Sequence, residues 1–289
     1  MLKVTNVMNA PNAMNATNPS NPMNPSPAID SAPVHVTQID RTGVIELARP
    51  AKFNCLSSAS LELIEAAFER FERPESNVAA VLIRAQGTHF CTGADLAAVL
   101  PLRADLEQMT QFVHGAHRVL GRLEASPLPV VVACQGLALA GGLELMLACD
   151  VAFAASDARF GDQHAQFGLL PGWGGSQRLT RLVGARRALD LLFSARWIDA
   201  DMALQWGLVN YVVAPEALHA AALAYCATLG TRSGAGLATM KQLARQGLEG
   251  SLAAGLELER SRVPTGLLHA DAGEGFAAFL ERRAPRFGG

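Results

Sequence analysis

Two short segments combine residue types that can stabilise and move charge. FCTGADL places Gly93 and Ala94 in a loop that leaves an apolar run, and AGGLELMLACD places Gly141 and Glu144 where another apolar run enters a helical pattern. Glycine lets a backbone approach a ligand closely, and the first N–H groups of a helix have no partner inside that helix. If the amides of Ala94 and Gly141 converge on one carbonyl oxygen, they stabilise a developing oxyanion.

Glu144 adds a carboxylate in the first turn of that helical pattern, where it can shuttle a proton. A simpler interpretation remains open. The glycines also permit close packing of a helix against a strand, and the helix dipole favours an acid in the first turn. For an isolated GGxE segment the packing interpretation is the better one, so the surrounding sequence has to decide.

The elements that would position these loops alternate between strand and helix. Residues 34–40 and 44–50 predict a hairpin. Apolar runs predict buried strands and amphipathic patterns predict helices between them: strands at 78–87, 129–136 and 150–156, and helices at 59–73, capped by Ser58, and at 104–124. This order indicates an α/β fold with parallel strands and helical crossovers, in which ligands collect beyond the C-terminal ends of the strands.

Three regions are expected along the chain. Residues 1–32 repeat Met-Asn and Asn-Pro fragments and are predicted to be a disordered tail, because they cannot bury enough apolar surface to offset chain ordering. Residues 33–200 form the α/β core, and residues 201–289 form a helical C-terminal region. Within the latter we expect a strand in 208–213 and helices near 216–229, 235–249, 252–261 and 271–283.

The composition argues against several classes of protein. The chain has 289 residues, 50% of them hydrophobic, and a formal net charge of −2, which gives no reason to expect a nucleic acid partner. No apolar run approaches the roughly 20 residues that span a membrane. The five cysteines form no CxxC pair and indicate reduced thiols in a cytoplasmic protein. Metal-ligand spacing, the P-loop and the GxSxG motif of serine hydrolases are missing.

Taken together, the motifs resemble the enoyl-CoA hydratase/isomerase (crotonase) superfamily from about residue 34 to the C-terminus. The resemblance rests on Arg49-Pro50 followed by NCLS, on the two segments above, and on ARFGDQHAQFGLLPGWGGSQRLTRLVG and DADMALQWGLVNYVV. It implies a crotonase-like spiral of ββα units with a C-terminal helical trimerisation region. It also implies a homotrimer or a dimer of trimers, and acyl-CoA thioester substrates in which coenzyme A is part of the substrate, with no cofactor or metal.

The resemblance assigns roles to individual residues. Ala94 and Gly141 become the oxyanion donors, and Glu144 becomes the first of two hydratase glutamates. His164 stands where the second glutamate is usual, and its ordinary pKa of about 6.5 suits proton transfer. Further substrate contacts are implied for a set of positions: Lys52, Phe53, Cys55, Asp95, Leu96, Gly142, Pro171, Gly172 and Trp173.

The expected activity is addition of water to the double bond of a 2-enoyl-CoA, with Glu144 as base towards the β-carbon and His164 as proton donor at the α-carbon. Alternatives stay open. His164 bonded to Asp162 with no catalytic part would leave Glu144 to shift a double bond, which is isomerase chemistry. Two further alternatives are thioester hydrolysis in the same oxyanion hole and binding of acyl-CoA without catalysis. Trp173 either walls the acyl pocket or only packs.

Overall fold

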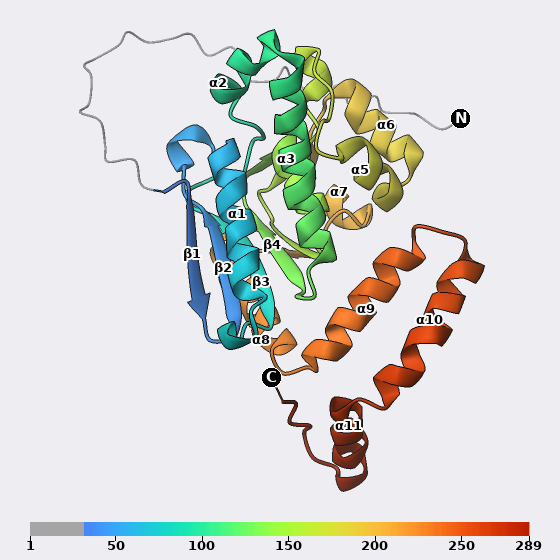
Figure 1. Ribbon diagram of the computed structural model, residues 1–289. Coiled ribbons are helices and arrows are strands. Elements are labelled where there is room, and N and C mark those ends of the chain that lie inside the picture. The colour runs from blue at the N-terminus through green and yellow to red at the C-terminus, as the bar shows by residue number, and fades with distance from the viewer. Residues whose placement is uncertain (1–31, 289) are drawn as a thin grey trace, which may run out of the picture. The chain divides into compact units, whose positions relative to one another are not determined.

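The computed structural model describes residues 32–288, shown in colour in Figure 1. The predicted disordered tail, residues 1–32, lies outside the described residues except for Ala32. The strands are β1 (Val34–Ile39), β2 (Thr42–Leu47), β3 (Ala80–Ala85), β4 (Val130–Cys134), β5 (Leu137–Leu139), β6 (Val151–Ala155), β7 (Arg159–Gly161), β8 (Ile198–Asp199) and β9 (Tyr211–Val213).

The helices follow the strands in alternation through the first part of the chain and then succeed one another directly. They are α1 (Ser58–Phe71), α2 (Leu96–Val99), α3 (Leu106–Ala125), α4 (Gly141–Leu147), α5 (Gly175–Val183), α6 (Ala185–Ser194), α7 (Ala200–Gln205), α8 (Leu218–Leu229), α9 (Gly234–Gly247), α10 (Leu252–Leu267) and α11 (Ala270–Glu281).

The main sheet has six strands in the order β1-β2-β3-β4-β6-β9. β1 and β2 form the predicted antiparallel hairpin, and every other neighbouring pair in this sheet is parallel. The predicted parallel arrangement of the three buried strands is therefore confirmed. Because the crossovers between parallel strands run through helices, the loops that follow β3 and β4 open at the same edge of the sheet.

Both faces of the main sheet are covered, which explains why its central strands are apolar without alternation. Val81 and Ile83 of β3 belong to one core cluster with Phe68 of α1. Leu82, between them, points to the other face and belongs to a second cluster with Leu218 of α8. α1 and α3 lie in front of the sheet in Figure 1, and α8 lies behind it.

The start of α1 corrects one expectation. Ser57, not Ser58, is the N-cap: its side chain accepts from the amide of Ser60, and its own amide donates to the Ser60 hydroxyl. This reciprocal capping box satisfies two donors at once, whereas a cap at Ser58 would satisfy only one.

A second sheet was missing from the predictions. Its strands β5, β7 and β8 have two or three residues each, too few to give a periodic signal in the sequence. β5 pairs in parallel with β7, and Ala138 of β5 also forms a parallel bridge with Cys91, in the loop that follows β3. This small sheet joins the two loops that the sequence singled out.

The helices α9–α11 follow the main sheet's last strand and leave large apolar side chains exposed, among them Leu248, Leu268 and Phe279. The helix predicted at 252–261 is longer than expected, since α10 continues through Pro264 to Leu267. None of the helices within residues 32–288 is long and apolar enough to cross a membrane.

Candidate active site

The loop after β3 and the turn before α4 meet at two glycines. A Cβ placed on Gly93 would lie 3.1 Å from the Gly141 nitrogen, and one placed on Gly141 would lie 3.2 Å from the Gly93 Cα. The Cys91–Ala138 bridge brings them together, with Cys91 N donating to Leu137 O and Leu139 N donating to Cys91 O. The motifs predicted that these two loops converge, and in the structure the loops are in contact.

The turn into α4 holds its first residue in an unusual conformation. Ala140 has φ 47° and ψ −121°, a region that glycine favours and that costs a residue with a Cβ about 1–3 kcal/mol. Its amide donates to Gly161 O at 3.0 Å, and its carbonyl accepts from Glu144 N at 3.0 Å. These bonds fix the turn, so the amide of Gly141 becomes the first donor of the helix and has no partner inside it.

The amide of Ala94 faces away from the neighbouring chain segment. Gly93 O accepts from Leu56 N and Asp95 N donates to Leu56 O, both at 2.8 Å. Because backbone groups alternate in direction along an extended chain, the intervening N–H of Ala94 points to the opposite side. Among residues 32–288 no acceptor is found for the amide of Ala94 or for that of Gly141. Both amides are therefore open donors, in the sense that neither has an acceptor in this part of the chain.

Glu144 lies in the first turn of α4 with only 1% of its surface exposed. Its Oε1 accepts two hydrogen bonds of 2.7 Å, from the backbone amides of Trp173 and Gly175. Burial raises the pKa of Glu144, while these two amides and the charge of His164 act in the opposite direction. One carboxylate oxygen is thus held by the protein, and Oε2 has no hydrogen-bond partner among the described residues.

His164 begins a short 3-10 helix after β7, and its Nδ1 lies 2.9 Å from Oδ1 of Asp162. Burial by itself lowers the pKa of His164, but the hydrogen bond and charge of Asp162, together with the charge of Glu144, outweigh it and raise the pKa. The pairing that the sequence left open is therefore present. With Nδ1 directed to Asp162, Nε2 is the ring nitrogen that can exchange a proton.

Trp173 contacts Glu144 through its backbone amide and Gly141 through its ring. Its amide holds Glu144, and its indole covers Gly141 so closely that a Cβ there would lie 2.5 Å from Cζ3. The Phe112 ring packs against the indole at a tilt of 58°, with 5.7 Å between centroids. The indole thus covers the turn that carries the Gly141 amide. The packing role weighed from the sequence describes this buried side chain, and a role as a wall of the acyl pocket stays a prediction.

Five of the remaining residues expected to contact substrate lie on two neighbouring segments. Lys52, Phe53 and Cys55 adjoin Asp95 and Leu96, because the bridge between Leu56 and Ala94 joins their segments. Lys52, Phe53 and Leu96 are exposed, whereas Asp95 is buried and forms an ion pair of 2.8 Å with Arg49. Substrate contacts by these residues stay predictions.

Gly142 and the pair Pro171 and Gly172 complete that set. A Cβ on Gly142 would lie 2.2 Å from Cys91 O, so this glycine is required for packing of α4 on the loop. Pro171 and Gly172 are partly exposed and precede Trp173, near Val113 of α3. Their contacts with substrate also stay predictions.

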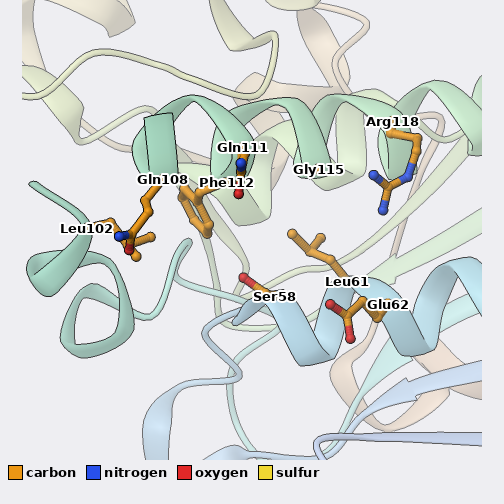
Figure 2. A pocket seen from close by; sticks show the side chains of 9 residues that line it. All are labelled: Ser58, Leu61, Glu62, Leu102, Gln108, Gln111, Phe112, Gly115 and Arg118. Carbon is orange, nitrogen blue, oxygen red and sulfur yellow. The ribbon is translucent and has the colours of Figure 1, made fainter. Parts of the chain in front are cut away.

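A cavity of about 340 Å³ lies between α1, α3 and the turn at residues 100–104 (Figure 2). Its lining is Ser58, Leu61, Glu62, Leu102, Gln108, Gln111, Phe112, Gly115 and Arg118. None of the predicted catalytic residues lines it. Phe112 connects the two places, since it lines the cavity and also packs on Trp173.

Sequence reasoning assigned no role to Phe112 or to Arg178, whose guanidinium contacts Trp173 O at 2.7 Å. Phe112 lies in a helix whose apolar pattern gives no hint of a ring packed at a tilt against Trp173. Arg178 lies three residues after the GWGG turn, but its partner Glu124 is 54 residues away and no spacing rule connects them.

Two open amides beside a buried carboxylate in a crossover α/β protein are the arrangement expected of a protein that stabilises an oxyanion next to a proton-transfer site. Comparison with known proteins makes this specific. Residues 40–289 match the family model for enoyl-CoA hydratase/isomerase. The chain therefore belongs to the enoyl-CoA hydratase/isomerase family and has the crotonase fold.

Relatives and solved structures agree with this assignment. The chain is 37% identical over 253 residues to a probable enoyl-CoA hydratase of Mycobacterium bovis, covering 87% of this chain and 96% of the relative. It is 32% identical over 243 residues to a short-chain-enoyl-CoA hydratase of Clostridium acetobutylicum, covering 84% and 92%. The crystal structure of an enoyl-CoA hydratase from Polaromonas sp. JS666 superposes with a TM-score of 0.85 at 30% identity, covering 88% and 99%.

Proposed function

We propose that this protein is an enoyl-CoA hydratase, which adds water across the double bond of a 2-enoyl-CoA. The observation that carries the proposal is the contact between the loop at Gly93 and the turn at Gly141, which leaves two open amides beside the buried carboxylate of Glu144. A thioester oxygen bound by both amides would gain negative charge as the enolate forms, and fixed donors stabilise that charge.

Glu144 and His164 divide the proton transfers. Oε2 of Glu144 takes a proton from water while the water oxygen bonds to the β-carbon, and the π electrons move onto the thioester oxygen. The enolate then collapses as Nε2 of the protonated His164 gives its proton to the α-carbon, which yields a 3-hydroxyacyl-CoA. A proton passing from Glu144 to His164 restores the starting state. Support comes from the raised pKa of His164, which keeps its ring protonated closer to neutral pH.

This chemistry uses only the protein's amides and side chains, with coenzyme A as part of the substrate. The test is a set of matched assays on the purified full chain. Loss of the ultraviolet band of crotonyl-CoA, with formation of 3-hydroxybutyryl-CoA, is the expected result. The proposal fails if crotonyl-CoA is stable in the presence of the enzyme.

The same assays identify the other possible functions. Conversion of a 3-enoyl-CoA to the conjugated 2-enoyl-CoA without hydration would indicate an isomerase that uses Glu144 alone. Release of free coenzyme A thiol would indicate hydrolysis. Tight binding of crotonyl-CoA with no turnover of either substrate would indicate an acyl-CoA binding protein.

We propose further that the protein forms a homotrimer or a dimer of trimers through its C-terminal helices. The support is the exposed apolar surface of α9–α11, where Leu248 is 83% and Leu268 is 88% exposed in the single chain. Exposure of so many large apolar side chains on consecutive helices favours a protein partner. Light scattering should give three or six times the chain mass of 30.5 kDa, and a monomer would refute this assembly.

A further inference from the structure

Arg178, in the first turns of α5, makes three directed contacts with its guanidinium. Nε and Nη2 donate to the two carboxylate oxygens of Glu124 at 2.8 and 2.6 Å, and Nη1 donates to Trp173 O at 2.7 Å. Its side chain is 17% exposed, so solvent screens these contacts only in part. A planar guanidinium with a fork of donors holds such partners in a fixed relation.

The turn that Arg178 holds is the one that binds the catalytic carboxylate. Trp173 and Gly175 each donate a backbone hydrogen bond to Glu144 Oε1, and Gly174 lies between them. Gly174 has φ 102°, and a Cβ there would lie 2.1 Å from Arg178 Nη1. The turn therefore takes a conformation that favours glycine and leaves room for the guanidinium against its backbone.

The same network reaches the other end of the helix that carries Glu144. Arg245 of α9 donates to Glu124 Oε1 at 3.1 Å, to Asp150 Oδ1 at 2.6 Å and to Ala148 O at 3.1 Å, beyond the last turn of α4. Lys241, also in α9, pairs with Asp150 at 2.7 Å. A cation at the C-terminal end of a helix is favoured by the helix dipole and satisfies its free carbonyls.

We propose that Arg178 is a positioning residue for Glu144. Arg178 fixes the Trp173–Gly175 turn, and its contact with Glu124, which Arg245 also binds, keeps the turn in place relative to α4. The proposal rests on the proposed function, because it assumes that Glu144 handles the proton. Arg178 does not touch the reacting atoms. Its effect is transmitted through the Trp173 carbonyl to the two amides that bind Glu144 Oε1.

Loss of this support should change the ionisation of Glu144, which loss of an ion pair remote from Glu144 would not do. The amides of Trp173 and Gly175 lower the pKa of Glu144 against the effect of burial. The other charged groups near Glu144 are His164, which lowers the same pKa, Asp162, which raises it, and Arg178 itself, whose positive charge interacts with the carboxylate and favours its ionised form. If the turn loosens, the two amide bonds weaken and the pKa of Glu144 rises further. Glu144 must be ionised to act as a base, so the rising limb of the activity profile moves to higher pH.

The test compares Arg178→Met with Arg181→Met, one turn further along the same helix. Arg181 is exposed and its side chain bonds only Gln177 among the described residues. With crotonyl-CoA, Arg178→Met should lower kcat on the order of ten- to a hundredfold with KM little changed, and should shift the rising limb of kcat to higher pH. Arg178→Lys, which replaces the fork by a single ammonium, should recover part of the loss. Arg181→Met should match the wild type.

Two further measurements keep the test decisive. Glu124→Gln removes the carboxylate that binds Arg178 through both oxygens, while Arg178 itself stays in the protein. This variant should also shift the rising limb of kcat to higher pH. Infrared difference spectra against Glu144→Gln follow the protonation of Glu144 directly, without turnover, so they report on positioning even if crotonyl-CoA is not the substrate. The proposal is overturned if Arg178→Met and Glu124→Gln lower thermal stability while kcat and the protonation of Glu144 keep the wild-type pH dependence.

Discussion

The backbone amide of Trp173 donates a hydrogen bond of 2.7 Å to the Glu144 carboxylate, and the indole of the same tryptophan covers Gly141, the proposed oxyanion donor. Trp173 therefore supports both the carboxylate of Glu144 and the proposed oxyanion hole, so we expect a substitution in one to affect the other. Fixed placement of donors before reaction is the main source of electrostatic stabilisation in such sites.

Replacement of Glu144 by glutamine should abolish turnover and spare binding. The amide oxygen of glutamine can still accept from Trp173 and Gly175, but it cannot take a proton from water. We expect kcat for crotonyl-CoA to fall on the order of a thousandfold, with the affinity for acyl-CoA preserved. Activity within tenfold of the wild type, about 1.4 kcal/mol of barrier, would show that Glu144 is not the base.

Thermal unfolding supplies the control for this variant. The raised pKa of Glu144 means that its contribution to stability is full below the unfolded value of about 4.3 and is lost as pH rises through the folded pKa. Glu144→Gln removes this loss, so it should unfold at an equal or higher temperature than the wild type above that pKa. If the variant is inactive but unfolds at such a temperature, its loss of activity is due to the missing carboxylate and not to misfolding.

Asp162→Asn tests the pairing with His164. Asparagine can still accept from Nδ1 but carries no charge, so the pKa of His164 should fall because its main raising influence is gone. In the proposed mechanism His164 donates its proton at the α-carbon, so activity should decline as pH rises through this pKa. The declining limb of kcat/KM should move to lower pH in the variant. If the limb does not move, it belongs to another group.

His164→Glu asks whether the native chemistry is hydration. The new carboxylate would lie beside Asp162 and near Glu144, and like charges at such distances disfavour ionisation of each other. We expect hydratase activity no higher than that of the wild type, measured with crotonyl-CoA. A sharp increase would indicate that the native protein catalyses a different crotonase reaction.

Gly141→Ala tests the oxyanion hole. The added Cβ would lie 2.5 Å from Trp173 Cζ3, so either the indole or the amide must shift, and we expect a loss of kcat on the order of a hundredfold. Gly121→Ala in α3 is the matched control. A Cβ there meets nothing within 4 Å, so activity should be unchanged and stability should rise by about 0.5–1 kcal/mol. Equal activities of the two variants would remove Gly141 from the hole.

The sequence predicted the parts of the fold whose signals are local. The hairpin, the buried central strands and the helix that begins at Gly141 all follow from hydrophobic runs and turn residues. The small second sheet was not predictable, because strands of two or three residues have no period. The longer extent of α10 was missed because Pro264 usually ends a helix.

In the site, too, residues with a local sequence signal were predicted and contacts between distant residues were not. Glu144 and the amides of Ala94 and Gly141 were singled out from motifs, and the structure brings their loops into contact. The partners of His164 and Glu144 were harder to foresee. The pairing with Asp162 was one of two possibilities, and the network through Arg178 joins residues 124, 178 and 245, whose proximity only the tertiary structure shows.

The most direct test of the central claim is a crystal structure of the protein with a bound acyl-CoA. The account predicts that the thioester oxygen lies about 3 Å from both the Ala94 and the Gly141 nitrogen, with Glu144 and His164 beside the reacting carbons. A thioester carbonyl directed away from these two amides would contradict it.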